Sequence, residues 1–327
     1  NWKDCYEKAA YYAGIIMGRN PDVSYGTYRL LSFDELWKKS GFDESEHMFS
    51  VRTRSADEEY GNGVHQWYCG MQDAGGVLQK GPWVGNRFHW YCLFDNEDYR
   101  ITKGVKHRFQ YDSQVKNGRG YYYPGTPEYK LMATGKNMDD VKVQEPVAPF
   151  NDGLTYTNSI SSNCLAFTTK YADVTDPTIG RTDAYWPFLR YADIVLIYAE
   201  AQCELNDGIS QDAIDALNDI RIRSNAKEAS VTGDGAIETK VELRSVIFEE
   251  RAKELAYEGD RRWDLLRWGI YLDVMNSLGG INEDGTRTPY DEGSINKRRE
   301  FRHLLYPLPS LEVSTNMAID KNNPGWN

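Results

Sequence analysis

The stretch Leu243–Tyr271, LRSVIFEERAKELAYEGDRRWDLLRWGIY, decides the fold of this chain. Its apolar residues recur three or four positions apart, which predicts two amphipathic helices with a tight corner between them. The residues that carry this spacing are Phe248, Ala252 and Leu255 in the first helix and Trp263, Leu266, Ile270 and Val274 in the second. Gly259 suits the left-handed conformation that often ends a helix, and Asp260 suits the N-cap of the next helix. The stretch therefore predicts a helical hairpin.

Charged side chains crowd this hairpin. They are Glu249, Glu250, Arg251, Glu254, Glu258, Arg261, Arg262, Asp264 and Arg267. Asp264 and Arg267 lie three residues apart, so we expect them to pair on an exposed helix face, where a pair contributes a few tenths of a kcal/mol. Dense ion pairs occur in structural networks as well as in active sites. We interpret this group as a scaffold that ties stacked helices together.

More helices are predicted upstream. Residues 1–18 carry an amphipathic pattern that ends at Gly18, and after Trp186 two further helical stripes follow, with Ser210 as the N-cap of the second. Those stripes are formed by Ile194, Ile197, Ala201 and Leu205, then by Ala213, Leu217 and Ile220. Helix pairs that cannot bury their apolar stripes alone are typical of tetratricopeptide-type arrays.

The segment 56–130 has a different character. Of its 75 residues 15 are aromatic, against 13% aromatic residues in the whole chain, and glycines lie between them. This mixture favours irregular loops and short strands. Flat rings beside hydrogen-bonding groups suit an amphipathic ligand such as a sugar, which exposes apolar C–H faces and many hydroxyl groups. The predicted ligand-binding residues are Trp67, Tyr68, Trp83, Asn86, Arg87, Trp90 and Tyr91.

We therefore expect a mostly α protein in which tetratricopeptide-type helical hairpins pack against an irregular, loop-rich region with short strands. The predicted divisions are residues 1–20, the last helix of an N-terminal repeat array; 21–185, the loop-rich ligand-binding region; 186–276, the helical-repeat scaffold; and 277–327, a C-terminal loop and tail. Short strands are expected within 105–111, 121–123 and 165–171. Trp263 and Trp268 are expected to belong to the scaffold, Trp326 to fix the tail, and His47 to lie at the surface.

Composition and motifs exclude several classes of protein. The net charge is −11, and Lys297-Arg298-Arg299 is the longest basic run, which does not suit a nucleic-acid binder. The five cysteines form no CxxC motif, and the five histidines show no metal-ligand spacing. The signatures of zinc proteases, serine hydrolases and nucleotide-binding enzymes are absent. The sequence predicts no catalytic residue, no metal site and no cofactor, although nothing in it excludes calcium.

Four stretches carry a family resemblance, in the same order as in the family. They are FLRYADIVLIYAEA (188–201), ALNDIRIRSNA (216–226), EERAKELAYEGDRRWDLLRWG (249–269) and YPLPSLEVSTNMAIDKNNPGW (306–326). Together they resemble the SusD/RagB family of outer-membrane nutrient-binding lipoproteins. The departures are small: Ala192-Asp193 stands where Ala-Glu is usual, and Lys321-Asn322 where Gln is common. The match is to the C-terminal portion, so we expect that the N-terminal part of the family protein, with its lipidated cysteine, is missing.

The resemblance implies a cell-surface protein anchored by lipid to the outer membrane. It further implies that a polysaccharide or oligosaccharide is bound without catalysis and passed to a TonB-dependent transporter of the SusC type. Loop residues vary within the family, so the resemblance assigns no role to a particular tryptophan here. Two alternatives remain: peptide binding of the RagB type on the same fold, and a glycoside hydrolase on a helical scaffold.

Overall fold

The computed structural model divides the chain into two compact units, residues 1–130 with 138–258 (unit 1) and residues 131–137 with 259–327 (unit 2). The structure describes residues 1–20, 23, 27–42, 45–55, 60–84, 90, 93–95, 97–106, 167–277 and 299–326, and the backbone alone of 108–112, 117–120 and 155–158. The predicted strand at 121–123 lies outside these residues. The predicted divisions at residues 20, 185 and 276 stay predictions.

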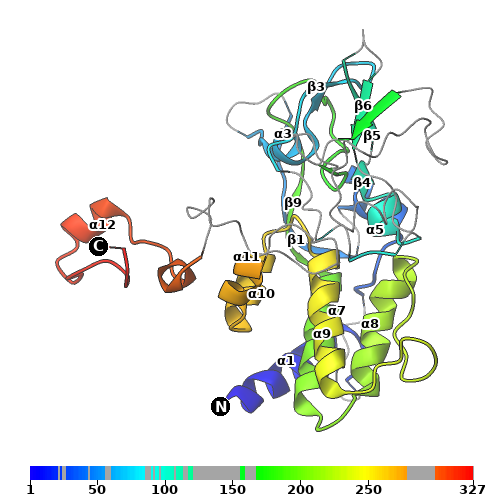
Figure 1. Ribbon diagram of the computed structural model, residues 1–327, viewed down its shortest axis with the longest axis vertical. Helices are drawn as coiled ribbons and strands as arrows, with labels where there is room; N and C mark the ends of the chain where they lie inside the picture. Colours follow the sequence, from blue (N-terminus) through cyan, green and yellow to red (C-terminus); the bar gives the residue numbers. More distant parts are fainter. Residues whose placement is uncertain are drawn as a thin grey trace. The chain divides into compact units, whose positions relative to one another are not determined.

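Four helices form the lower part of unit 1 in Figure 1. They are α1 (Trp2–Ile16), α7 (Tyr191–Leu205), α8 (Gln211–Arg223) and α9 (Lys240–Glu254). Helix α7 packs against each of the other three, and α8 also contacts α9. Helix α1 is followed by Gly18 at φ 69°, as its sequence predicted. The predicted helical scaffold is therefore confirmed.

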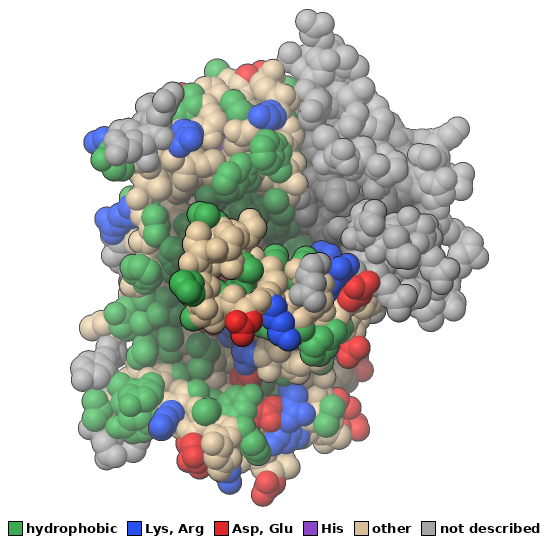
Figure 2. Space-filling view, turned by 90° about the vertical axis from the view of Figure 1, so that its left-hand side faces the viewer, with side chains coloured by type: hydrophobic (Ala, Val, Ile, Leu, Met, Phe, Trp, Pro, Cys, Tyr) green, Lys and Arg blue, Asp and Glu red, His purple; other side chains and the backbone are tan. Residues whose placement is uncertain are grey.

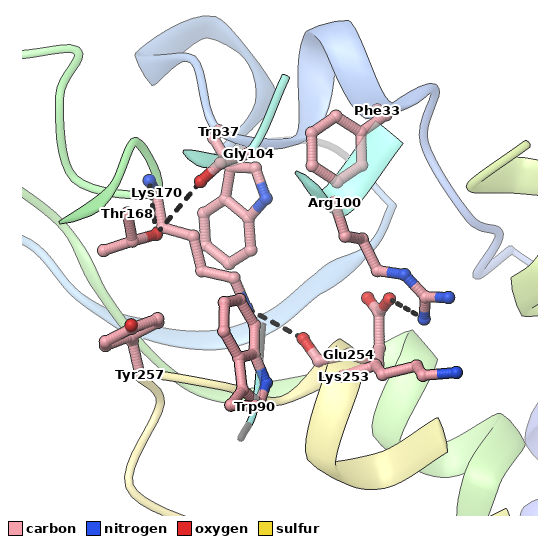
Figure 3. Close-up of a pocket in the computed structure, with 10 residues that line it drawn as sticks. All are labelled: Phe33, Trp37, Trp90, Arg100, Gly104, Thr168, Lys170, Lys253, Glu254 and Tyr257. Carbon is pink, nitrogen blue, oxygen red and sulfur yellow. Dashed lines mark hydrogen bonds and ion pairs between the residues drawn. The ribbon is translucent and has the colours of Figure 1, made fainter. Parts of the chain in front are cut away.

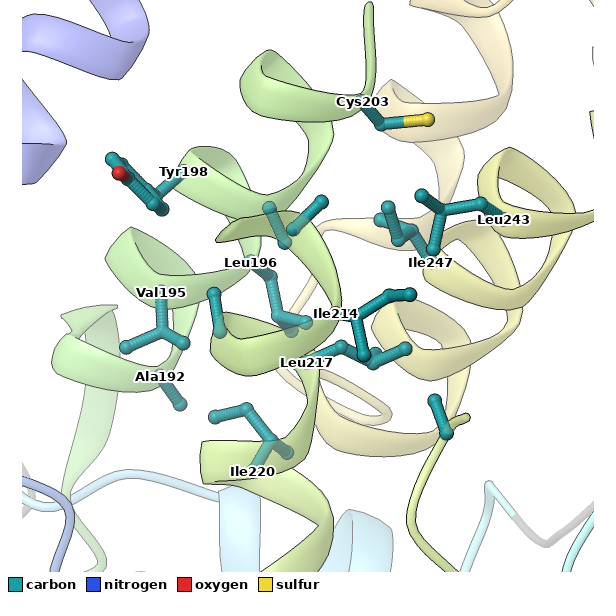
Figure 4. Packing of buried hydrophobic residues seen from close by; sticks show 14 of the residues in the cluster. Ala192, Val195, Leu196, Tyr198, Cys203, Ile214, Leu217, Ile220, Leu243 and Ile247 are labelled. Atoms are coloured by element: carbon teal, nitrogen blue, oxygen red, sulfur yellow. The ribbon is translucent and has the colours of Figure 1, made fainter. Parts of the chain in front are cut away.

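The core of these helices consists of branched aliphatic side chains. Leu196 of α7, Ile214 and Leu217 of α8, and Leu243 and Ile247 of α9 are at most 2% exposed and point toward one another (Figure 4). Burying one such side chain contributes about 1.5–3 kcal/mol. The outer face of α1, unlike this core, exposes aromatic rings. Figure 2 shows hydrophobic side chains gathered on the lower part of the face that it presents, where the helices lie.

Helix α9 starts with a capping box. The Thr239 hydroxyl accepts from the Glu242 N–H at 3.1 Å, and the Glu242 carboxylate accepts from the Thr239 N–H at 3.1 Å. We expect Thr239→Ala to lower the free energy of unfolding by about 1 kcal/mol, because two backbone donors lose their arrangement. Urea titration measures this change. Thr239→Ser keeps the hydroxyl and should stay near the wild type; equal losses in both variants would contradict the capping role.

The rest of unit 1 consists of short elements. Helical turns are α2 (Phe33–Leu36), η1 (Lys39–Gly41), α3 (Val64–Cys69) and α5 (Tyr99–Thr102). The strands pair as β1 (His47–Val51) with β9 (Trp186–Arg190), β2 (Met71–Gln72) with β3 (Leu78–Lys80), and β4 (Val105–Lys106) with β8 (Phe167–Thr168), all antiparallel. A further sheet has the order β5 (Arg108–Asp112), β6 (Asn117–Gly120), β7 (Thr155–Asn158), with β6 and β7 parallel. This loop-rich region with short strands was predicted.

Charged side chains gather inside unit 1, in what we call the buried ion network. It comprises Glu46, Asp98, Arg100, Lys170, Arg190, Arg221, Arg223, Glu250, Glu254 and Glu258. Arg190, 1% exposed, is at its centre, with ion pairs of 2.6 Å to Glu46, 2.6 Å to Glu258 and 3.1 Å to Glu254. A single guanidinium of strand β9 therefore joins the residue before strand β1 to the end of helix α9.

Helix α9 supplies two carboxylates of the network from one face. Glu250 pairs with Arg100 at 2.5 Å and with Arg221 at 2.8 Å, and one turn later Glu254 pairs with Arg223 at 2.5 Å. Burial by itself would raise the pKa of Glu254, but Arg223, Arg190 and Arg100 hold that pKa well below its ordinary value. Every carboxylate of α9 that is buried here thus has a cation beside it, which satisfies the requirement for a charge away from water.

The network explains why the predicted apolar stripe of α9 is partly wrong. The buried face runs through Leu243, Ile247, Glu250 and Glu254, whereas Phe248 is only partly buried. Carboxylates continue the stripe because their partner cations are buried with them. The predicted scaffold role of the charges is supported, since the pairs join separate elements of unit 1.

His47 is not at the surface, and that prediction is wrong. Its ring lies 4.4 Å from the Phe42 ring, and its Nε2 is 2.9 Å from the Leu36 carbonyl oxygen. Burial lowers the pKa of His47 to about 4, because a charged imidazolium would lose its hydration. The burial of His47 could not be predicted from the sequence. The charged residue before it, Glu46, is also buried, so polar and apolar residues do not alternate regularly here.

Unit 2 consists of short helices: α10 (Arg261–Arg267), α11 (Tyr271–Ser277), η4 (Phe301–Leu304) and α12 (Ser310–Thr315). The helix predicted to run from Trp263 to Val274 is interrupted at Gly269, which has φ 73°. Trp263 was placed on its buried stripe but is 58% exposed, because α10 buries Asp264 and Leu265 instead. The predicted Asp264–Arg267 pair forms at 2.9 Å, with Asp264 buried.

Two features were predicted at the ends of unit 2, one at Gly259 and Asp260 and the other at Trp326. Gly259 has the predicted positive φ, 103°, but it does not end α9, which already ends at Glu254. Asp260 is in the αR region and its side chain does not cap α10. The Trp326 indole donates to the carbonyl groups of Arg302 and Leu305 at 2.8 and 3.1 Å. Trp326 therefore fixes the tail, as its sequence position predicted.

Candidate functional site

The backbones of two exposed tryptophans are hydrogen-bonded to each other at one short helix. Trp67 lies on α3, and Trp83 follows strand β3. The Trp67 carbonyl accepts hydrogen bonds from the backbone N–H groups of both Trp83 and Val84, each at 2.9 Å. The two residues are 45% and 68% exposed. We call this pair the tryptophan platform; two predicted site residues are thus brought together at the surface.

The opposite face of α3 explains the exposure of Trp67. Val64, His65 and Cys69 are buried, and the His65 Nδ1 lies 2.8 Å from the Tyr171 carbonyl oxygen. With that face packed inward, Trp67 points away from it. The helix then ends at Gly70, where φ is 75° and a Cβ atom would come within 2.5 Å of the Lys80 carbonyl oxygen. Only glycine allows the chain to pass so close to β3.

The backbone also approaches the Trp67 ring closely. A Cβ atom on Gly63 would lie 3.0–3.2 Å from three atoms of that ring. The indole therefore lies against the backbone of Gly63, which limits its freedom although it is exposed. A cation accompanies the other ring, since the Lys80 Nζ is 5.5 Å from the centroid of a Trp83 ring. The platform thus combines flat apolar faces with a hydrogen-bond donor.

Tyr68, another predicted site residue, is partly buried and packs against other aromatic rings. Its ring lies 5.3 Å from the Tyr171 ring, 6.2 Å from the Trp186 ring and 5.6 Å from the Tyr257 ring. Partial burial raises the pKa of Tyr68 above its ordinary value. These contacts place Tyr68 with a hydrophobic cluster beneath α3. We assign it a supporting position below Trp67.

Trp90 is also held by its neighbours. Its indole Nε1–H donates to the Ala252 carbonyl at 2.7 Å, and its ring lies 4.7 Å from Phe94 and 5.7 Å from Tyr257. Figure 3 shows it at the wall of a cavity of about 10 Å³, beside Lys170 and Glu254. That volume is the size of one water molecule. Trp90 therefore anchors its segment to α9, and we leave it out of the platform.

The remaining predicted site residues, Asn86, Arg87 and Tyr91, lie outside the described residues. Within the described part of the chain, no group of three or more His, Cys, Asp or Glu side chains is placed to hold a metal ion. Likewise, no helix in that part is both long and apolar enough to span a membrane.

A second hollow lies elsewhere in unit 1 and was missed by the sequence reasoning. It has a volume of about 580 Å³, and Tyr28, Tyr99 and Tyr191 are among the residues that line it. We call it the tyrosine cleft. Its residues come from four separate segments of the chain, so no local motif could have indicated it.

Comparison with known proteins adds to this geometry. The family model described as "SusD family" matches residues 72–326, which is most of the chain. The chain belongs to the SusD family. Two of the four motifs described above, 188–201 and 216–226, lie within unit 1, and all four lie within the matched range.

Curated relatives match part of the chain. SusD-like proteins P2 and P38 of Formosa agariphila are 33% and 36% identical over 142 residues, 42% of this chain in both cases. The matched segment spans a quarter of the length of each relative.

Solved structures share the fold over nearly the whole chain. A SusD homolog from Bacteroides thetaiotaomicron aligns with a TM-score of 0.64 and 22% identity, over 99% of this chain and 60% of that one. Surface glycan-binding protein A from the same organism, in complex with laminarihexaose, aligns with a TM-score of 0.59 and 20% identity, over 98% and 60%. At these identities the likeness shows the fold, and the mostly α, SusD-like architecture predicted from the sequence is confirmed.

Proposed function

We propose that this SusD-family chain binds a polysaccharide or oligosaccharide at the tryptophan platform and does not transform it. The observation that carries the proposal is a pair of exposed tryptophans whose backbones are joined through the Trp67 carbonyl oxygen, with the Trp67 indole lying against Gly63. An exposed ring that is already held in place loses little conformational freedom when a ligand covers it. Asn86 and Arg87 follow Trp83 directly in the sequence, and we propose them as hydrogen-bonding partners of the ligand.

Membership in the SusD family and a structural neighbour described as a surface glycan-binding protein support a glycan rather than another ligand. Rings that lie open at the surface suit a chain of sugars, which can run across several weak sites. A peptide ligand of the RagB type would favour an edge strand beside a deep apolar pocket. The platform joins a short helix to a residue after β3 and presents its rings, not a strand edge.

Affinity gel electrophoresis against a panel of soluble polysaccharides, laminarin among them, tests the proposal. We expect at least one polysaccharide to retard the wild type, and Trp67→Ala or Trp83→Ala to weaken binding by about 30-fold, since a central aromatic contact contributes about 2 kcal/mol. Trp263→Ala is the matched control, because Trp263 is an equally exposed tryptophan in unit 2. Its affinity should equal that of the wild type.

Two results would contradict the proposal. Retardation by no polysaccharide, together with binding to a pool of peptides, would favour peptide binding instead. New reducing ends released from a bound polysaccharide, with release abolished by a single carboxylate substitution, would show a glycoside hydrolase.

We further propose that the bound glycan passes to a TonB-dependent transporter of the SusC type, and that the protein is held at the outer face of the outer membrane by a lipid. Membership in the SusD family supports both proposals. Purifying the full-length protein from outer membranes, with and without detergent, tests them. A transporter subunit should co-purify after detergent extraction, and the protein should stay with the membrane in its absence.

A further inference from the structure

The tyrosine cleft has the dimensions and the walls of a ligand site. Its volume of about 580 Å³ falls within the range of roughly 300–1,000 Å³ that small-molecule sites cover. The segment 27–34 forms one wall, α5 another, and the start of α7 with the end of α8 a third. The Tyr99 N–H donates to the Ser224 carbonyl at 2.8 Å, which joins α5 to the residue after α8. All of these segments belong to unit 1.

Three tyrosines contribute aromatic rings and hydroxyl groups to this lining. Tyr28 and Tyr191 stack with centroids 6.5 Å apart and an interplanar angle of 18°. All three tyrosines are partly buried, and no hydroxyl group of Tyr28, Tyr99 or Tyr191 has a hydrogen-bond partner within the described part of the chain. Partial burial raises the pKa of Tyr191, so its hydroxyl stays protonated at neutral pH. The cleft thus offers ring faces and three hydroxyl groups that can each donate one hydrogen bond and accept others.

The charges of the cleft offset one another. Lys103 pairs with Asp34 at 2.8 Å, and Asp219 pairs with Arg19 at 2.8 Å. Arg223, which also lines the cleft, is neutralised from behind by Glu254. Two of the three cations that line the cleft thus lie beside a carboxylate, and the third, Arg29, donates to the Ser45 hydroxyl at 3.3 Å, so the lining has little net charge. It favours a neutral ligand that makes many hydrogen bonds.

The walls are fixed before any ligand arrives. The Leu31 N–H donates to the Glu46 carboxylate at 2.6 Å, and the Tyr191 N–H donates to the Glu46 carbonyl at 2.8 Å. Two walls of the cleft are thereby attached to one residue of the buried ion network. A site that is held in shape loses less entropy on binding, which raises its affinity for a weakly held ligand.

We infer that the tyrosine cleft is a second carbohydrate-binding site, which takes a short neutral oligosaccharide. Half-buried rings match the apolar faces of a pyranose, and the free hydroxyl groups match its own hydroxyls. The inference goes beyond the proposed function, because none of the residues named here belongs to the tryptophan platform. Two separated sites on one chain strengthen the hold on a long polysaccharide that reaches both.

Methyl NMR of isotope-labelled protein tests the inference at the cleft itself. Ile222 lines the cleft and is 61% exposed, so its methyl group reports on a ligand there, with Ile222→Val to assign the signal. The probes are laminarihexaose, maltohexaose and cellohexaose, added one at a time. We expect one of them to shift the Ile222 signal to saturation in the Trp67→Ala/Trp83→Ala double variant, in which the platform is removed.

Substitutions in the cleft complete the test. Tyr28→Ala should raise the dissociation constant for the Ile222 shift about tenfold or more, and Tyr28→Phe less, because it keeps the ring. Unchanged thermal unfolding shows that the variants fold. An Ile222 signal that none of the three probes moves, that moves only while the platform is intact, or that responds equally in Tyr28→Ala would overturn the inference. A shift at Ile222, together with polysaccharide retardation that is unchanged in Trp67→Ala and Trp83→Ala, would instead support the cleft and contradict the platform.

Discussion

Replacing Glu254 by alanine is expected to lower the free energy of unfolding by about 3–5 kcal/mol, because buried cations lose their partner. The Glu254 carboxylate lies 2.5 Å from Arg223, 3.1 Å from Arg190 and 3.5 Å from Arg100, and it is 2% exposed. Denaturant unfolding followed by circular dichroism measures the loss.

The control comes from the same helix. Glu249 pairs with Lys253 at 2.6 Å, but its side chain is 43% exposed. Exposed pairs contribute little, so Glu249→Ala should change the stability by less than about 1 kcal/mol. Similar losses in Glu254→Ala and Glu249→Ala would show that the buried ion network does not hold unit 1 together. Glu254→Gln keeps the shape without the charge, and a loss close to that of alanine would assign the effect to charge.

The second large effect is a loss of stability in mild acid that depends on His47. Its Nε2 is hydrogen-bonded to the Leu36 carbonyl, whereas its buried Nδ1 has no partner in the described structure. Protonation would bury an unpaired N–H and a positive charge, with Arg190 also opposing it. The pKa of His47 is therefore lowered from 6.5 to about 4.

The sign follows from proton binding. Between pH 6.5 and about 4 the unfolded chain protonates this histidine and the folded chain does not, so stability falls as the pH falls. From pH 7.5 to pH 5 we expect a loss of about 2 kcal/mol from this residue. Urea titrations at several pH values measure it, and His47→Gln, which keeps a donor for Leu36, should flatten the dependence.

Other titrating groups also make the stability depend on pH, so their contributions must be separated from that of His47. His65 acts in the same direction, because burial lowers its pKa too, whereas burial raises the pKa of Glu46, which acts in the opposite direction. The readout is thus the difference between wild type and His47→Gln rather than the total slope. An identical pH dependence in the two proteins would contradict the role of His47.

Much of the fold could be predicted from the sequence because helical periodicity is local. The apolar stripes of α7 and α8 have the spacing of a helix face, and Gly18, at positive φ, marks the real end of α1. Prediction failed where burial depends on a distant partner. Glu250 and Glu254 occupy core positions only because Arg100 and Arg223 arrive from elsewhere, and no periodicity analysis treats a carboxylate as a core residue.

The site could be predicted only in part. Trp67 and Trp83 each lie between glycines in the sequence, and both are exposed. Trp90 has the same local surroundings in the sequence, but its indole finds the carbonyl of Ala252, 162 residues away. Composition identifies a region rich in rings without separating those that face solvent from those that anchor the segment. The tyrosine cleft is assembled from four separate segments, so only the folded chain reveals it.

The buried ion network also has a consequence for how such sequences change over time. A mutation that reversed the charge at position 254 would place like charges beside both Arg190 and Arg223, and no single reversal at either arginine would repair it. Replacements at these positions must therefore be inherited together or not at all. Among descendants of one ancestral gene, the charged motifs should persist as a linked set while the ring-bearing loops diverge freely toward new nutrients.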